Sequence, residues 1–189
     1  MRVADLYCGI GTITDVATQQ GCNVVAAADK DPYALQQYEH MHGLDIPLYG
    51  NVSRELDKEG PLSLRSAIQD IDLVVMGTPC HNFSSLNMHS DLRTAESDCL
   101  WSIPKVLESK PKMVLVENVT NLLKAQRGKL FQNLQQEIQS KGYVVDYHVE
   151  NATSYGSCQS RERLFLSVIR DDVVAKCGPL MRTLPESGA

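Results

Sequence analysis

The sequence lacks the long hydrophobic runs, paired cysteine motifs and low-complexity stretches that mark several classes of protein. No apolar run in its 189 residues approaches the roughly 20 needed to span a bilayer, which argues against a membrane protein. The six cysteines are scattered, with no Cys-x-x-Cys pair and no histidine spacing typical of zinc, so we expect no metal site. Acidic and glycine residues come too early for a signal peptide. We therefore expect a cytoplasmic protein, or a nuclear one in a eukaryote.

The sequence also has no internal repeat and no linker rich in proline or glycine. Its hydrophobic content of 43% and charged content of 22% are ordinary for a globular protein. The length fits one compact domain with an ample core and argues against two full domains. We expect one domain over residues 1–170, followed by a tail or a severed connection over residues 171–189.

Negative charge predominates, and it is unevenly distributed. The formal net charge is −5; residues 1–120 carry 9 Lys and Arg against 16 Asp and Glu, whereas residues 121–170 carry 7 against 4. Sequence-independent affinity for nucleic acid comes from neutralising phosphates, so an acidic protein is a poor stand-alone binder of a polyanion. Any contact with nucleic acid is expected to use the later, basic part or a partner, although a basic solvated face would give the same counts.

Strand-like apolar runs alternate with helical patterns along the chain. We expect strands over 1–7, 24–28, 47–49, 71–76, 112–116, 143–149 and 164–169, and helices over 12–20, after Pro32, over 61–69, 95–108 and 121–140. Buried strands interleaved with helices predict a doubly wound α/β domain with a mainly parallel sheet. No helical period separates the last two strands, so we expect them to form an antiparallel pair at one edge.

Cys80 is a candidate nucleophile because it follows the buried run at 72–76 in the segment Gly-Thr-Pro-Cys-His-Asn-Phe-Ser. A cysteine just beyond a buried strand can face a cleft, and Pro79 stiffens the turn before it. A lone cysteine is more often a small buried hydrophobe, so the assignment depends on the remaining chain.

A glycine turn follows the first predicted strand in the segment Asp-Leu-Tyr-Cys-Gly-Ile-Gly-Thr at 5–12. The third glycine of a dinucleotide fingerprint would fall at Thr14, which disfavours a pyrophosphate cofactor. Asp29 lies at the end of the second strand, where a carboxylate can accept hydrogen bonds from both ribose hydroxyls. An adenosine cofactor without pyrophosphate, such as S-adenosylmethionine, fits this pattern.

Two further segments place charged residues at strand ends. Glu117 directly follows the run at 112–116, and a carboxylate at that depth has a raised pKa unless it is paired. In its protonated form Glu117 could donate a hydrogen bond to a ring nitrogen of a nucleobase. Arg161 and Arg163 precede the last strand. The alternatives are a helix start capped by Asn118 or Thr120 and a surface ion-pair cluster of the Arg-Glu-Arg triplet.

Taken together, these segments resemble the catalytic half of the cytosine-5 DNA methyltransferase family over residues 1–170. Five short motifs occur in the family's order: Asp-Leu-Tyr-Cys-Gly-Ile-Gly at 5–11, the ribose motif around Asp29, Pro79-Cys80 with Phe83-Ser84, Glu117-Asn118-Val119, and Asn151 through Gly156 to Gln-Ser-Arg-Glu-Arg at 159–163. The resemblance implies the S-adenosylmethionine-dependent methyltransferase fold for residues 1–170. It also implies cytosine-containing DNA as substrate, with the base flipped out of the duplex.

The resemblance further implies roles for individual residues. The Cys80 thiolate would add to C6 of cytosine, Glu117 would hold the N3 and N4 edge, Arg163 would reach O2, and Arg161 would support the base or the nucleophile's loop. The S-adenosylmethionine contacts would come from Asp5, Tyr7, Gly9, Gly11, Asp29, Lys30, Asn51, Val52, Pro79 and Leu100.

The chain departs from the family pattern at a few positions and in length. His81, Thr78, Cys158 and Asn51 replace the family's usual residues, and the target-recognition domain and last two motifs do not follow. We therefore expect a catalytic core that works with a separate recognition chain, or a truncated enzyme. Two alternatives are methylation of a free cytosine nucleotide or single strand, and a non-enzymatic regulatory relative that binds S-adenosylmethionine.

Overall fold

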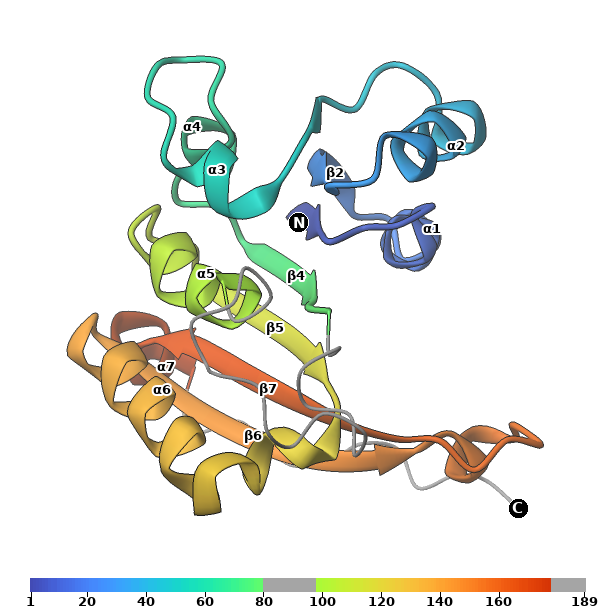
Figure 1. Cartoon of the computed structure of the whole chain (residues 1–189). Coiled ribbons are helices and arrows are strands. Elements are labelled where there is room, and N and C mark those ends of the chain that lie inside the picture. Colours follow the sequence, from blue (N-terminus) through green and yellow to red (C-terminus); the bar gives the residue numbers. More distant parts are fainter. Residues whose placement is uncertain (80–97, 178–189) are drawn as a thin grey trace.

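In the computed structural model, one seven-stranded sheet runs through the whole domain, with its strands in the order β3-β2-β1-β4-β5-β7-β6 (Figure 1). The structure describes residues 1–79 and 98–177. The strands are β1 (Arg2–Leu6), β2 (Asn23–Ala28), β3 (Leu48–Tyr49), β4 (Leu73–Gly77), β5 (Met113–Asn118), β6 (Tyr143–Asn151) and β7 (Glu162–Arg170). β1 to β5 pair in parallel, and β7 pairs antiparallel with both β5 and β6. The predicted doubly wound fold with an antiparallel edge pair is confirmed.

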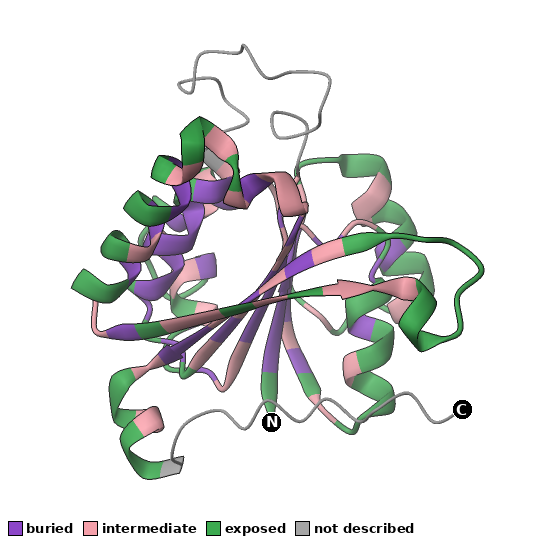
Figure 2. Cartoon of the chain, turned by 90° about the horizontal axis from the view of Figure 1, so that it is seen from below, coloured by how far each residue is buried: buried purple, intermediate pink, exposed green. Residues whose placement is uncertain are grey.

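Helices lie on both faces of the sheet (Figure 1). They are α1 (Thr12–Gln19), α2 (Pro32–His42), α3 (Val52–Leu56), α4 (Leu64–Ala67), α5 (Asp98–Leu107), α6 (Lys129–Ser140) and α7 (Asp171–Cys177), with the 3-10 helices η1 (Thr120–Leu123), η2 (Ala125–Gly128) and η3 (Ala152–Tyr155). α1 and α2 pack on one face of the sheet, over β1 and β2, and α3 to α6 cover the opposite face. Figure 2 shows buried positions concentrated where these helices meet the sheet.

The main core forms between α3–α6 and alternate residues of the strands. Side chains such as Leu6, Met76, Val116 and Leu166 point to this face and are fully buried. Because successive side chains of a strand point to opposite faces, Leu115, Glu117 and Phe165 point the other way, and they are only partly buried. Within the described ranges, α6 packs on β6 from the core side, and β6 also contacts the short elements α7 and η3. On the other face, a cavity lies open over β5, β6 and β7.

Several elements differ from the sequence prediction. The helix expected over 121–140 is broken: Gln126 and Arg127 have left-handed backbone angles (φ 49° and 57°), and α6 begins only after Gly128. The helix expected over 61–69 shortens to α4, and neither α3 nor α7 was expected. Glu117 lies within β5 rather than just after it. Apolar spacing continues across the break, so periodicity alone could not reveal it.

None of the helices in the described part of the chain is both long enough and apolar enough to cross a membrane.

Candidate active site

The candidate site residues gather at one edge of the sheet because parallel strands end on the same side. Leu6 of β1 pairs with Ala28 of β2 and Met76 of β4, and Gly77 pairs with Glu117 of β5. β7 runs antiparallel, so it begins at this edge and brings Arg163 there. Ligands of open α/β sheets bind at this carboxyl edge.

The glycine turn after β1 is a tightly constrained loop. Tyr7, Gly9 and Gly11 all have positive φ (61°, 54° and 94°), and a Cβ at Gly11 would overlap the ring of His42 and lie 2.8 Å from Tyr38. His42 also contacts the loop directly, with Nε2 3.0 Å from the Ile10 carbonyl oxygen. A Cβ at Gly9 would meet no atom within 4 Å, so this side of the loop borders open space in which a ligand fits.

Tyr7 is held by α5. A left-handed conformation costs a residue that carries a Cβ about 1–2 kcal/mol, and the Tyr7 hydroxyl lies 2.9 Å from Ser102 Oγ, which fixes the side chain. Ser102 in turn donates to the Cys99 carbonyl. The α5 helix therefore holds the glycine turn through the contact between Ser102 and Tyr7. Leu100 of the same helix is buried in the core.

Asp29 joins the two strand ends at which a cofactor is expected. Its Oδ2 accepts from the Gly9 amide at 2.9 Å, and its Oδ1 accepts from the Asp31 amide at 2.9 Å. Each carboxylate oxygen has a second lone pair, so Asp29 can still accept the two hydroxyls of a ribose. Lys30, next to it, is exposed.

Asp5 is buried beneath the glycine turn and binds the start of α1. It is 1% exposed, and its Oδ2 accepts from both the amide and the hydroxyl of Thr14 on α1. Burial raises the pKa of Asp5 to about 6, against the lowering effect of the Thr14 hydrogen bonds. Its carboxylate therefore positions the turn instead of facing the open side.

The third strand end carries Asn51 and Val52. Asn51 is exposed and caps α3, because its Oδ1 accepts from the Arg54 amide at 3.2 Å. That oxygen can accept one more hydrogen bond from a ligand. The Val52 side chain is buried in the core, so only its backbone faces this edge.

Thr78 fastens the end of β4 to the end of β5. Its Oγ1 donates to the Glu117 carbonyl at 3.1 Å and accepts from Asn118 Nδ2 at 2.7 Å, and both Thr78 and Asn118 are buried. A helix does start here, since η1 begins at Thr120, but no side chain caps it, so the predicted capping by Asn118 or Thr120 is wrong. Pro79, half-buried, follows this joint. The predicted nucleophile Cys80 lies outside the described residues.

Cys8, in the glycine turn, is a poor substitute for Cys80 as a nucleophile. Its thiol is buried, and burial raises its pKa to about 12, so it carries almost no thiolate near neutral pH.

Glu117 and Arg163 form an ion pair across β5 and β7. Arg163 Nε lies 2.8 Å from Glu117 Oε1, and the side chains of Arg163 and Glu117 are 22% and 34% exposed, respectively. The pairing contradicts the alternative of a local cluster within the Arg-Glu-Arg triplet, since Arg163 reaches a different strand. Arg161 is anchored by its amide, which donates to Asn151 Oδ1 at 3.2 Å.

These three charged side chains line a cavity of about 620 Å³ on the open face of the sheet. Its other lining residues are Leu115, His148, Glu150, Ala152, Tyr155 and Phe165. The rings of His148 and Phe165 stack with centroids 5.6 Å apart, and the Tyr155 hydroxyl donates to Glu150 at 2.8 Å. Sequence analysis missed these residues, although the period-two alternation of β5, β6 and β7 places Leu115, His148, Glu150 and Phe165 on the face of Glu117 and Arg163. Ala152 and Tyr155 reach the cavity from η3.

Comparison with known proteins gives a consistent match over almost the whole chain. The family model described as C-5 cytosine-specific DNA methylase matches residues 1–186. The Type II methyltransferase M.BsuFI of Bacillus subtilis is 29% identical over 170 residues, covering 89% of this chain and 39% of that protein. The Type II methyltransferase M.NgoBI of Neisseria gonorrhoeae is 30% identical over 173 residues, covering 91% and 51%.

Solved structures share the fold. The S. pombe Dnmt2 methyltransferase superimposes with a TM-score of 0.67 at 19% identity, covering 100% of this chain and 57% of that one. The Entamoeba histolytica methyltransferase EhMeth gives a TM-score of 0.71 at 15% identity, covering 98% and 55%. The chain thus spans about half the length of these proteins, or less.

Proposed function

Because the chain belongs to the family of C-5 cytosine-specific DNA methylases, we propose that it transfers a methyl group from S-adenosylmethionine to C5 of cytosine in DNA. The observation that carries the proposal is the Glu117–Arg163 ion pair at the carboxyl edge of the sheet. Glu117 lies on β5, which pairs with β4, and the chain continues from the end of β4 through Pro79 to Cys80. A nucleophile, a carboxylate and a guanidinium would thereby converge on one base.

In the proposed mechanism, the Cys80 thiolate forms a bond to C6 and pushes electrons toward C5. Glu117 holds the N3 and N4 edge and shares a proton with it, and Arg163 donates to O2, so both stabilise the developing charge. C5 takes the electrophilic methyl group that S-adenosylmethionine would supply, and the donor leaves as S-adenosylhomocysteine. Loss of the C5 proton then expels Cys80 and restores the aromatic ring. Arg161, at the cavity mouth, supports the base or the loop that carries Cys80.

The cofactor would lie over the glycine turn. Gly9 gives it close backbone approach, and Gly11 shapes the turn against His42 and Tyr38. Asp29 accepts the ribose hydroxyls, and Asn51 accepts from the adenine amino group. Lys30, Pro79 and the backbone of Val52 border the same edge. Asp5, Tyr7 and Leu100 have buried or tethered side chains, so we assign them to shaping the turn.

We also propose that activity on DNA requires a second polypeptide that carries target recognition. The open face above β5 and β7 has an apolar floor formed by Leu115 and Phe165. Apolar residues of the neighbouring turn and helix, Ile10 and Val16, are 48% and 54% exposed.

The test is a methyl-transfer assay on duplex DNA, RNA and dCMP, with and without the polypeptide encoded next to this chain, alongside calorimetry with S-adenosylmethionine. We expect cofactor binding by the chain alone and transfer to duplex DNA once the second polypeptide is added. Cys80→Ser should abolish transfer and leave cofactor binding intact. Normal transfer by that variant would refute the covalent scheme, and transfer to dCMP alone would refute DNA as the substrate.

A further inference from the structure

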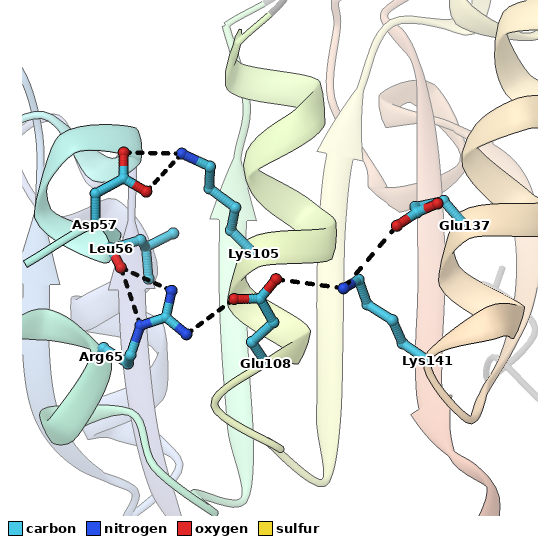
Figure 3. Close-up of polar contacts among 7 residues, drawn as sticks. All are labelled: Leu56, Asp57, Arg65, Lys105, Glu108, Glu137 and Lys141. Carbon is cyan, nitrogen blue, oxygen red and sulfur yellow. Dashed lines mark hydrogen bonds and ion pairs between the residues drawn. The ribbon is translucent and has the colours of Figure 1, made fainter.

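Half of the cations in residues 1–79 and 98–177, eight of sixteen, lie within 4.0 Å of a carboxylate. Figure 3 shows one such network, in which Lys105 contacts Asp57 at 2.8 Å, and Glu108 contacts both Arg65 (2.9 Å) and Lys141 (3.3 Å). The same holds for Lys58, Lys112, Arg163, Arg170 and Lys176. Such cations are poorly available to an external anion, because binding it would first break an existing ion pair.

Three of the cations without such a partner lie close together in the sequence, from the end of η1 to the start of α6. Lys124, Arg127 and Lys129 are exposed, and none has an acidic partner within 4.0 Å among residues 1–79 and 98–177. The remaining cations in those ranges that lack such a partner do not form a comparable cluster in the sequence. A net charge of −5 makes a compact set of free cations unusual for this chain.

The backbone of this segment is strained. Gln126 and Arg127 adopt left-handed angles and Gly128 follows at φ 84°, so three consecutive residues have positive φ. Left-handed non-glycine residues cost about 1–2 kcal/mol each and persist only where the surroundings impose them. Here the buried Leu122 and Leu130 anchor the segment on both sides. The three cations are thus held on a fixed turn.

This turn lies at the same edge as the candidate active site. Lys124 follows the last residue of β5 by six positions, a span of at most about 20 Å even when fully extended. The intervening η1 coils the chain and packs against β7, which carries Arg163. In Figure 1, η1 follows the tip of β5 and leads into the start of α6.

We propose that Lys124, Arg127 and Lys129, which we call the basic turn, bind the phosphate backbone of the nucleic acid whose cytosine enters the cavity. The inference rests on the proposed function, since it takes the cavity as the base site. Exposed cations without an acidic partner, at the edge of the sheet where the cavity also lies, can neutralise phosphates without breaking ion pairs, and this neutralisation supplies sequence-independent affinity. The basic turn thus compensates locally for the acidic character of the chain.

The test compares the wild type with the triple variant K124Q/R127Q/K129Q in titrations of a labelled DNA duplex between 50 and 200 mM salt. Each lost phosphate contact should reduce the slope of log K against log salt by about 0.9, so three should reduce it by about 2.7. Affinity at the lower salt concentration should fall at least tenfold. Affinity for S-adenosylmethionine and the unfolding midpoint in urea should not change.

The matched control is R2Q/K110Q, which removes two exposed cations at the opposite edge of the sheet and should leave the slope unchanged. An equal slope for the wild type and the triple variant, or no DNA binding by the wild type, would refute the proposal that the basic turn binds phosphates. If the slopes differ but no methyl transfer is detected with the second polypeptide present, phosphate binding by the basic turn is supported and the proposed function is refuted. If methyl transfer is detected but the slopes are equal, the proposed function is supported and phosphate binding by the basic turn is refuted.

Discussion

Arg163 Nε lies 2.8 Å from Glu117 Oε1 across two antiparallel strands, although 46 positions separate the two residues in the sequence. The pair links a strand of the parallel part of the sheet to the antiparallel edge. It also keeps the carboxylate oriented at the mouth of the cavity. Removing either partner should therefore disturb the other.

We predict that Glu117→Gln and Arg163→Gln each lower the rate of methyl transfer by 100-fold or more, in line with about 10²–10³ for the loss of one group that stabilises a transition state. Single-turnover assays with saturating DNA would measure this. Glu162→Gln is the control, since Glu162 is exposed and its side chain has no ion pair in the described part of the protein. Rates within threefold of wild type for both test variants would contradict the assignment.

Asp29→Asn should weaken S-adenosylmethionine binding by roughly 10- to 100-fold, because a hydrogen bond to a charged acceptor contributes about 1.5–3 kcal/mol. The asparagine side chain also has only one acceptor oxygen, whereas the two oxygens of Asp29 accept from the backbone amides of Gly9 and Asp31. Calorimetry gives the affinity directly. Asp31→Asn keeps the cap on α2, since asparagine caps helices as well as aspartate, and should bind the cofactor normally. Equal affinity for wild type and Asp29→Asn would exclude the ribose role.

Asp5 should make the stability depend on pH in an unusual direction. Burial raises its pKa to about 6 in the folded protein, above the unfolded value of 3.8. Between about pH 4 and 6 the folded state therefore binds more protons, and the contribution of Asp5 to the free energy of unfolding falls as pH rises. Relative to wild type, Asp5→Asn should gain up to about 3 kcal/mol between pH 4 and 7, at about 1.4 kcal/mol per pKa unit.

Urea unfolding of both proteins at pH 4, 5, 6 and 7 would measure this difference. A difference that stays constant over the whole range would show that ionisation of Asp5 is not coupled to folding.

The joint between β4 and β5 depends on the Thr78 hydroxyl. Thr78→Val should lower the free energy of unfolding by about 1–3 kcal/mol, because it leaves the buried Asn118 amide without its partner. Thr78→Ser keeps the hydroxyl and should lose less. Denaturant unfolding of the two variants compares them, and a loss for Thr78→Val no larger than the loss for Thr78→Ser would contradict the stabilising role of the hydroxyl's hydrogen bonds.

Several features followed from local sequence. The alternation of apolar runs and helical patterns predicted the parallel strands, and the missing helical period between the last two strands predicted the antiparallel edge pair. The glycine turn at 9–11 and Asp29 lie at the carboxyl ends of β1 and β2, as predicted, because parallel strands end at one edge. Such features depend on periodicity and turn chemistry within about ten residues.

Other features required the tertiary structure. The break at Gln126 and Arg127 follows from the anchoring of Leu122 and Leu130 in the core, which no periodic pattern distinguishes from a continuous helix. The short helix α3, capped by Asn51, was also not anticipated. Residues 80–97, with the predicted nucleophile Cys80, lie outside the described part, so the role of Cys80 stays a prediction.

The sequence by itself determined which residue types stand at each strand end, because a strand and its following turn are specified locally. Only the folded chain decided that Glu117 pairs with Arg163 and not with a neighbour in its own segment. The same is true of the cavity, which needs β5, β6 and β7 side by side and one face left open. Strand order and antiparallel register are long-range choices, set by which apolar faces are buried together.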